Sequence, residues 1–129
     1  MNMEKGHYIT DDEREKCRSV VDAFAELYDR TDTIVVDARR YGFVKLQYYM
    51  LPHGFETIAT YRDSKKLFED LWQDWFEELL LTEEEKILLE DLDYEEIFAL
   101  FPAERQKEIL VIKRKFEEKS GISNHNRKL

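Results

Sequence analysis

Apolar residues recur at three- and four-residue spacing near the start of the chain. Thr10 and Glu13 form the signature of a capping box, with a hydroxyl at the N-cap and a carboxylate three positions later. The apolar stripe that follows consists of Cys17, Val20, Val21, Phe24, Leu27 and Tyr28. Because residues three and four apart share one face of a helix, the pattern predicts an amphipathic helix over about residues 11–29.

From residue 33 the apolar residues recur at every second position, as in a β-strand. Three short segments rich in β-branched and aromatic residues follow, at 33–38, 43–50 and 55–61. The two faces of the second segment are Val44, Leu46, Tyr48 and Met50 on one side and Phe43, Lys45, Gln47 and Tyr49 on the other. The links between the segments are short turns that contain Gly42 and Gly54. Short links favour antiparallel pairing of neighbours, so we expect a three-stranded meander.

Helical spacing returns after the third strand. Helices are expected over about residues 64–81, 83–90, 94–101 and 102–119. Capping boxes mark the starts of the two short helices, Thr82 with Glu85 and Asp93 with Glu96. Gly121 is expected to end the last helix, with Ile122 making the contact of a Schellman motif.

This order of elements predicts an α+β fold. It has an N-terminal helix, a three-stranded antiparallel meander, and three to four C-terminal helices packed on one sheet face. We expect a single domain over residues 1–122 and a disordered tail over 123–129.

The predicted helix at 64–81 has an unusually wide apolar face. In the stretch LFEDLWQDWFEELLL (67–81), apolar pairs repeat every four residues, so each repeat drifts by about 40° around the axis. The pairs together cover roughly 220°, against about 100° for an ordinary apolar stripe. Such a helix packs on the sheet and on a second element, for which the C-terminal helix is the candidate. Otherwise the edge with Phe76 and Leu80 stays open to a partner or a second copy, and Trp72, Trp75 and Phe76 become apolar anchors.

Negative charge is concentrated in the same part of the chain. The 129 residues carry a net charge of −9, and residues 63–101 alone contain 14 acids and 3 bases. The candidate partner-binding surface, here called the acidic ridge, comprises Asp70, Asp74, Glu77, Glu78, Glu83, Glu84, Glu85, Glu90, Asp91, Asp93, Glu95 and Glu96. It is either a solvated face with helix-start acids favoured by the dipole, or a surface that competes with nucleic acid for a basic groove.

The segment RRYGFVKL (39–46) resembles the RNP1 motif of RNA-recognition domains. The resemblance implies RNA binding by Arg39, Arg40, Tyr41, Phe43 and Lys45. Its aromatic residues would stack on bases while the cations contact phosphates. Arg40 stands where the motif has glycine, and a third strand follows where that fold has a helix. The alternative is a tight hairpin with an exposed Arg-Arg turn, and the net negative charge disfavours direct nucleic-acid binding.

Other chemistry finds little support in the sequence. DLDYEE (91–96) has Glu96 where a calcium loop needs glycine, and His7, His53 and His125 lie far apart, so we expect no metal or cofactor. Cys17 lies on the apolar stripe, which indicates a buried thiol rather than a nucleophile. The carboxylates are expected on exposed helical faces where nothing shifts their pKa values, so we expect no enzyme.

At the level of class, the chain resembles the anti-CRISPR proteins, the small acidic inhibitors of phages and mobile elements. The resemblance rests on size, on the acidity of LFEDLWQDWFEE and TEEEKILLEDLDYEE, and on the absence of a catalytic motif. It implies a cofactor-free protein in the host cytosol, monomeric or homodimeric, that blocks a basic partner such as a Cas9-type nuclease. Acidic immunity or adaptor proteins share these features. The absence of a leader and of a long apolar run favours a cytoplasmic protein without membrane contact.

Overall fold

The computed structural model describes residues 8–28, 33–49 and 54–122 of the chain. The helices are α2 (Asp11–Leu27), α3 (Ser64–Trp75), α4 (Glu83–Leu88), α5 (Tyr94–Leu100) and α6 (Ala103–Ser120). The strands are β1 (Thr33–Asp37), β2 (Phe43–Tyr49) and β3 (Gly54–Tyr61), with a short 3₁₀ helix η1 (Arg39–Tyr41) and a π-helical turn η2 (Phe76–Leu80). The predicted α+β class and order of elements are confirmed. The tail assigned to 123–129 lies outside the described residues.

The sheet is the predicted meander. β1 pairs with β2 and β2 with β3, both antiparallel, in the order β1-β2-β3. Gly42, between η1 and β2, has a φ of +105°, and a Cβ built there would lie 2.3 Å from the carbonyl oxygen of Tyr61. Only glycine fits this close approach, which brings the start of β2 against the end of β3.

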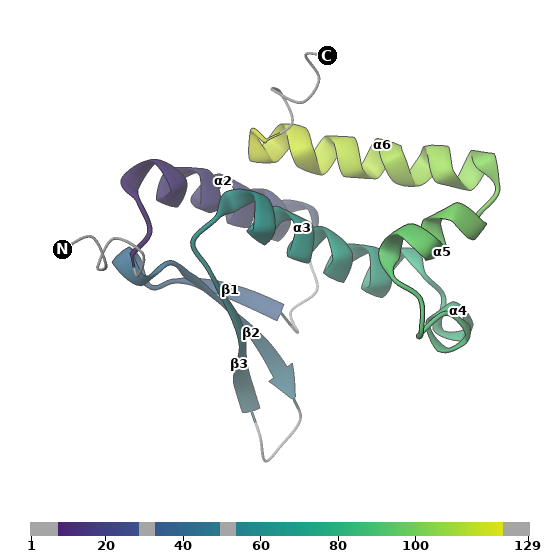
Figure 1. Cartoon of the computed structure of the whole chain (residues 1–129), viewed down its shortest axis with the longest axis horizontal. Helices are drawn as coiled ribbons and strands as arrows, with labels where there is room; N and C mark the ends of the chain where they lie inside the picture. Colours follow the sequence, from purple (N-terminus) through teal and green to yellow (C-terminus); the bar gives the residue numbers. More distant parts are fainter. Residues whose placement is uncertain (1–7, 29–32, 50–53, 123–129) are drawn as a thin grey trace.

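The elements form three layers (Figure 1). The sheet lies on one side of α2 and α3, and α6 lies on the other side of this helix pair, while α4 and α5 sit at one end. The Phe116 ring of α6 stacks on Phe68 of α3 at a centroid distance of 4.4 Å and lies 5.3 Å from Trp75. The wide apolar face of α3 is therefore covered on two sides, as its sequence predicts.

The helix predicted over 64–81 changes its winding at Phe76. It is α-helical to Trp75 and π-helical from Phe76 to Leu80. In a π turn each residue rotates by less than the ~100° of an α-helix. The wider turn therefore reverses the drift of the apolar pairs beyond Phe76, which is itself in the core (1% exposed). Of the edge that could have served a partner or a helix-mediated homodimer, Phe76 is buried and Leu80 is half-buried.

The helix ends follow the capping chemistry of the sequence. Two of the three predicted capping boxes are present, Thr82 with Glu85 and Asp93 with Glu96. At the third, the Thr10 hydroxyl accepts the Glu13 N–H, but the Glu13 carboxylate accepts the N–H of Ser64 instead of closing the box. The N–H of Gly121 donates to the Glu118 carbonyl and that of Ile122 to the Glu117 carbonyl, which is the predicted Schellman motif.

The face of the sheet that the helices cover is not the more apolar one. The face turned to the helices carries Phe43 (2% exposed), Lys45 (7%) and Tyr61 (5%). The opposite face, which includes Ile34, Val36 and Ile58, is 40–45% exposed at these three side chains. The more polar face of the meander is thus the buried one.

Candidate partner-binding surface

The segment from the start of α4 to the end of α5, including the link between them, holds most of the acidic ridge. Each helix begins with a capping box, and each has further acids in its first turn, Glu83 and Glu84 in α4 and Glu95 in α5. Acids are favoured at these positions because the first backbone N–H groups of a helix carry partial positive charge. Local helix stability thus accounts for part of the charge density of this segment.

Arg105 of α6 fixes the position of α4. Its guanidinium donates to both carboxylate oxygens of Glu85 at 2.7 and 2.9 Å, and to the carbonyl of Leu80 at 2.9 Å. It also lies 3.9 Å from the ring centroid of Phe101. The hydrogen bonds from Arg105, with that from the Thr82 backbone N–H, lower the pKa of Glu85 to about 2. Glu85 is therefore already paired with Arg105 of the same chain, and this pair anchors α4.

Two other acids of the ridge face the sheet. Asp74 accepts a hydrogen bond from Lys45 of β2 at 2.9 Å, and Asp70 accepts one from the Tyr61 hydroxyl of β3. Burial raises the pKa of Asp74 even though Lys45 opposes the shift. Burial and the Asp70 carboxylate likewise raise the pKa of Tyr61. The expectation that the ridge acids lie on exposed faces is wrong for Asp70, Asp74 and Glu85, which are half-buried. The expectation of unshifted pKa values is wrong for Asp74, Glu77 and Glu85.

The remaining nine acids are exposed and are called here the exposed acidic surface: Glu77, Glu78, Glu83, Glu84, Glu90, Asp91, Asp93, Glu95 and Glu96. Partial desolvation and the neighbouring carboxylates of Asp74 and Glu78 raise the pKa of Glu77. Lys86 is the one base in the sequence between residues 69 and 96, and its ammonium lies 3.2 Å from Glu83 and 3.7 Å from Glu78. Carboxylates therefore greatly outnumber cations here.

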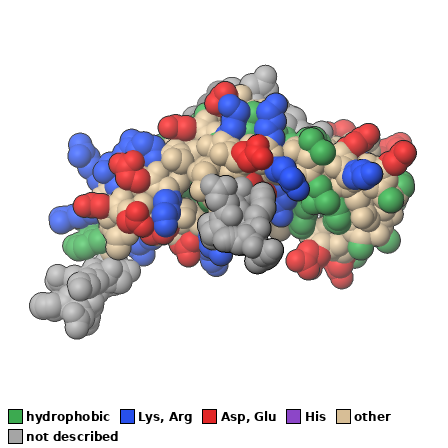
Figure 2. Space-filling view, turned by 90° about the horizontal axis from the view of Figure 1, so that it is seen from above, with side chains coloured by type: hydrophobic (Ala, Val, Ile, Leu, Met, Phe, Trp, Pro, Cys, Tyr) green, Lys and Arg blue, Asp and Glu red, His purple; other side chains and the backbone are tan. Residues whose placement is uncertain are grey.

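The apolar side chains beside these acids differ from the predicted anchors. Trp72 (2% exposed), Trp75 (6%) and Phe76 (1%) are core residues and cannot anchor a partner. Ile87 (70% exposed) and Leu88 (79%) instead project from α4. At this end of the molecule, acidic and hydrophobic side chains lie side by side (Figure 2). The signal available in the sequence is the shortness of the helix predicted over about residues 83–90, because so short a helix buries only one face.

The hairpin with the RNP1 resemblance offers only part of its expected surface. Phe43 and Lys45 are buried against α3, so Phe43 cannot stack on a base. Tyr41 is 51% exposed, and Arg40 lies 5.6 Å from its ring centroid. Arg39 has a φ of +61°, inside the turn. Arg39, Arg40 and Tyr41 remain at the surface, without the paired aromatic platform that the motif implies.

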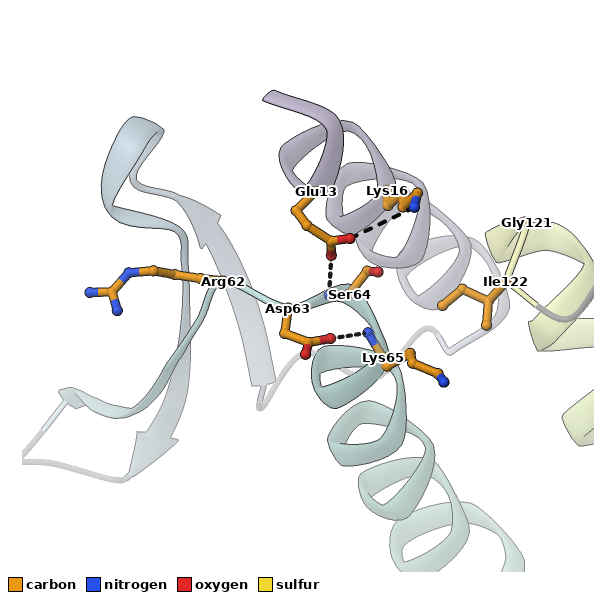
Figure 3. A pocket seen from close by; sticks show the side chains of 8 residues that line it. All are labelled: Glu13, Lys16, Arg62, Asp63, Ser64, Lys65, Gly121 and Ile122. Carbon is orange, nitrogen blue, oxygen red and sulfur yellow. Dashed lines mark hydrogen bonds and ion pairs between the residues drawn. The ribbon is translucent and has the colours of Figure 1, made fainter. Parts of the chain in front are cut away.

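A hollow of about 490 Å³ lies where the starts of α2 and α3 meet the end of α6 (Figure 3). Its charged groups interact with one another. Glu13 accepts the N–H of Ser64 at 2.8 Å and lies 3.7 Å from the Lys16 ammonium, and Asp63 accepts the N–H of Lys65. The bond from Ser64 to Glu13 therefore fastens the start of α3 to α2, and the Glu13 and Asp63 carboxylates are occupied within the chain.

Within the described ranges, no group of three or more His, Cys, Asp or Glu side chains is arranged to hold a metal ion. His7, His53 and His125 lie outside these ranges. No described helix has the length and apolar character needed to cross a membrane. Cys17 is buried, as predicted, and burial raises its pKa to about 12.

Comparisons with protein-family models, with curated proteins and with solved structures find no match for this chain.

Proposed function

We propose that this chain is a non-enzymatic binding protein that inhibits a nucleic-acid-handling protein by covering its basic groove. The observation that carries the proposal is the exposed acidic surface around α4 and α5, with Ile87 and Leu88 projecting among its carboxylates. Apolar side chains rimmed by charge are the usual composition of a protein-binding site. The class-level resemblance to anti-CRISPR proteins points to the same role.

The acids act by charge complementarity. A groove that binds nucleic acid presents lysines and arginines to a line of phosphates, and carboxylates can neutralise the same cations. Such attraction accelerates association and weakens as salt rises. Ile87 and Leu88 then add contacts that are less sensitive to salt. Arg105 supports binding indirectly, because it holds α4 in place before the partner arrives.

The first partner to test is a Cas9-type nuclease loaded with guide RNA, since the proposal places the chain in a host cytosol beside such proteins. Labelled target DNA is titrated into this complex in a gel-shift assay with and without the chain. The proposal expects the DNA shift to weaken as the chain is added, with no shift when the chain meets DNA or RNA alone. An unaffected shift argues against this partner class.

Charge-reversal variants test the surface itself. Glu83→Lys/Glu84→Lys/Glu95→Lys changes three exposed acids on α4 and α5 and is expected to lower inhibition more than tenfold. The matched control, Glu15→Lys/Asp22→Lys/Glu118→Lys, makes the same change in net charge on exposed positions of α2 and α6. Equal loss in both variants would mean that net charge alone matters, and no loss in either would refute the acidic-surface proposal.

Direct RNA binding is the alternative outcome. If the chain retained labelled RNA by itself, and Arg39→Ala/Tyr41→Ala abolished that retention, the η1 hairpin would take the place of the acidic surface as the binding site.

A further inference from the structure

A hollow lined by arginines lies at the end of the molecule away from the exposed acidic surface. The start of α2 lies at the end opposite α4 and α5 (Figure 1), and the Ile9 N–H before it donates to the Arg40 carbonyl of η1 at 2.8 Å. Between η1 and the start of α2 is a hollow of about 450 Å³, a volume typical of small-molecule sites. It is called here the η1 hollow, and its lining includes Ile9, Asp11, Arg14, Arg39, Arg40 and Tyr41.

Two arginines of the η1 hollow have guanidinium groups without an ionic partner. Arg14 is already paired with Asp37 at 2.7 Å, whereas Arg39 and Arg40 are exposed and form no ion pair within the described residues. The Arg40 guanidinium lies over the Tyr8 ring, 4.8 Å from its centroid. Contact through the flat face of a guanidinium leaves the N–H groups at its edge able to donate. Two such groups in one hollow favour an anion with several acceptor oxygens, as a phosphate has.

The backbone of the turn holds these groups in place. The Asp37 carboxylate accepts the N–H of Arg39 at 2.7 Å, and the Gly42 N–H donates to the Arg39 carbonyl at 3.1 Å. Arg39 has a φ of +61°, a region in which a residue with a Cβ is strained and glycine is not. The turn alone would therefore be better served by glycine at position 39, and the guanidinium is what arginine adds there.

The tyrosine adds a preference for a flat ring. Tyr41 is 51% exposed and lines the η1 hollow together with Arg39 and Arg40. An exposed aromatic ring beside cations can stack on a nucleobase while the cations bind its phosphate. Asp11, the one acid in this lining, repels anions, and the net charge of −9 repels a polyanion as a whole. A ligand with one phosphate group therefore fits better than a long strand.

We infer that the η1 hollow is a binding site for a nucleotide, with Arg39 and Arg40 on the phosphate and the Tyr41 ring on the base. The site is independent of the proposed inhibitory function, because the η1 hollow and the exposed acidic surface share no residue. One phosphate and one stacked base give weak binding, with a dissociation constant of about 0.1–1 mM. A complex of this strength dissociates during electrophoresis and gives no gel shift.

An NMR titration of the ¹⁵N-labelled chain tests the inference. AMP is expected to shift the amide signals of residues 9–11 and 39–42. It should bind at least about fivefold more tightly than adenosine or inorganic phosphate, because each of these lacks half of the contacts. A 5′-phosphorylated tetranucleotide distinguishes two sources of the same chemistry: binding as tight as that of AMP assigns the end of a strand, and weaker binding assigns the free nucleotide. Adenosine or phosphate binding as tightly as AMP, or shifts confined to other residues, would overturn the inference.

A glycine at position 39 separates ligand binding from folding. Arg39→Gly removes one guanidinium and relieves the positive φ, so AMP binding should weaken at least about fivefold while the urea midpoint stays at or above that of the parent. Arg114→Gln, at an exposed position of α6, makes the same change in net charge and should bind AMP like the parent. Asp11→Asn should tighten binding about twofold, because the opposing carboxylate is removed. Unchanged AMP binding in Arg39→Gly, or an equal loss in Arg114→Gln, would refute the assignment of the η1 hollow.

Discussion

The ion pair between Lys45 and Asp74 makes a strong prediction about stability. Lys45 is the one lysine whose side chain is buried among the described residues, and it comes from the central strand. Its ammonium lies 2.9 Å from Asp74 of α3, whose side chain is 26% exposed. Removing one member of a buried pair strands the other charge and costs about 3–5 kcal/mol. The partial exposure of Asp74 lowers this, so Lys45→Met is expected to cost ~2–4 kcal/mol.

The double variant Lys45→Met/Asp74→Leu distinguishes the contribution of the ion pair to stability from that of the packing around it. Replacing both charges by apolar side chains of similar size is close to neutral in many proteins, because neither desolvated charge remains. We expect the double variant to recover most of the stability lost in Lys45→Met. Urea denaturation measures both, with Lys107→Met, a substitution of an exposed lysine on α6, as the control for loss of a positive charge.

The pH dependence gives a second measurement on the same variant. Burial already raises the pKa of Asp74, and loss of Lys45 removes the interaction that opposes this shift. An acid with a raised pKa in the folded state is most favourable below its unfolded pKa, and its contribution is lost as pH rises toward the folded pKa. Lys45→Met should therefore regain stability, relative to the parent, as pH falls from neutral toward the unfolded value of 3.8. A cost below ~1 kcal/mol, a double variant no more stable than Lys45→Met, or no relative gain on acidification would refute this reasoning.

Further predictions concern the anchors of the helices and turns. Arg105→Ala should lower the free energy of unfolding in urea by ~2–3 kcal/mol, and Arg105→Lys should restore less than half, because lysine cannot make the paired bonds to Glu85 and the Phe101 contact. Since the pKa of Glu85 is lowered to about 2, its stabilisation is present above the unfolded value of 4.5 and is lost as pH falls from there toward 2; Glu85→Gln should flatten this part of an acid titration. Gly42→Ala should cost more than ~2 kcal/mol, because its Cβ meets a backbone carbonyl, whereas Gly121→Ala, with open space around it, should cost ~1 kcal/mol. The Cys17 thiol should react with an aromatic disulfide reagent only at the rate of unfolding, and rapid labelling under native conditions would contradict its burial.

Much of the fold is predictable because local chemistry determines it. The caps at Thr10, Thr82 and Asp93 mark helix starts through side-chain hydrogen bonds that involve only neighbouring residues. Gly121 ends α6 for a similarly local reason. The width of the apolar face of α3 also predicts that the face is covered from two sides, by the sheet and by α6. The π turn at Phe76–Leu80 was missed, because it depends on how the end of that helix meets α5 and α6.

The candidate site was less predictable, because charge in a sequence does not show which carboxylates are occupied. In the sequence, Asp70, Asp74 and Glu85 cannot be distinguished from the other acids of the ridge. Each accepts a hydrogen bond from a side chain at least nine residues away in the chain. The partners lie on β3, β2 and α6, so only the tertiary fold brings them together. The same holds for the apolar anchors, since the aromatic residues are buried by α5 and α6 while Ile87 and Leu88 are left outside.

The choice of sheet face follows from the acids of α3. Alternation in β2 is compatible with burial of either face, and hydrophobicity alone favours Val44 and Leu46 over Lys45. Burying that face instead would place Asp74, whose side chain is 26% exposed, against apolar side chains without a cation, at a cost of ~2–4 kcal/mol. Each aliphatic side chain on the outer face of the sheet would gain only part of the ~1.5–3 kcal/mol of full burial, since Ile34, Val36 and Ile58 are only 40–45% exposed. The cost of an unpaired Asp74 and the gain from burying the aliphatic side chains are of similar size. The Lys45–Asp74 pair and the Tyr61–Asp70 hydrogen bond therefore decide the orientation of the sheet.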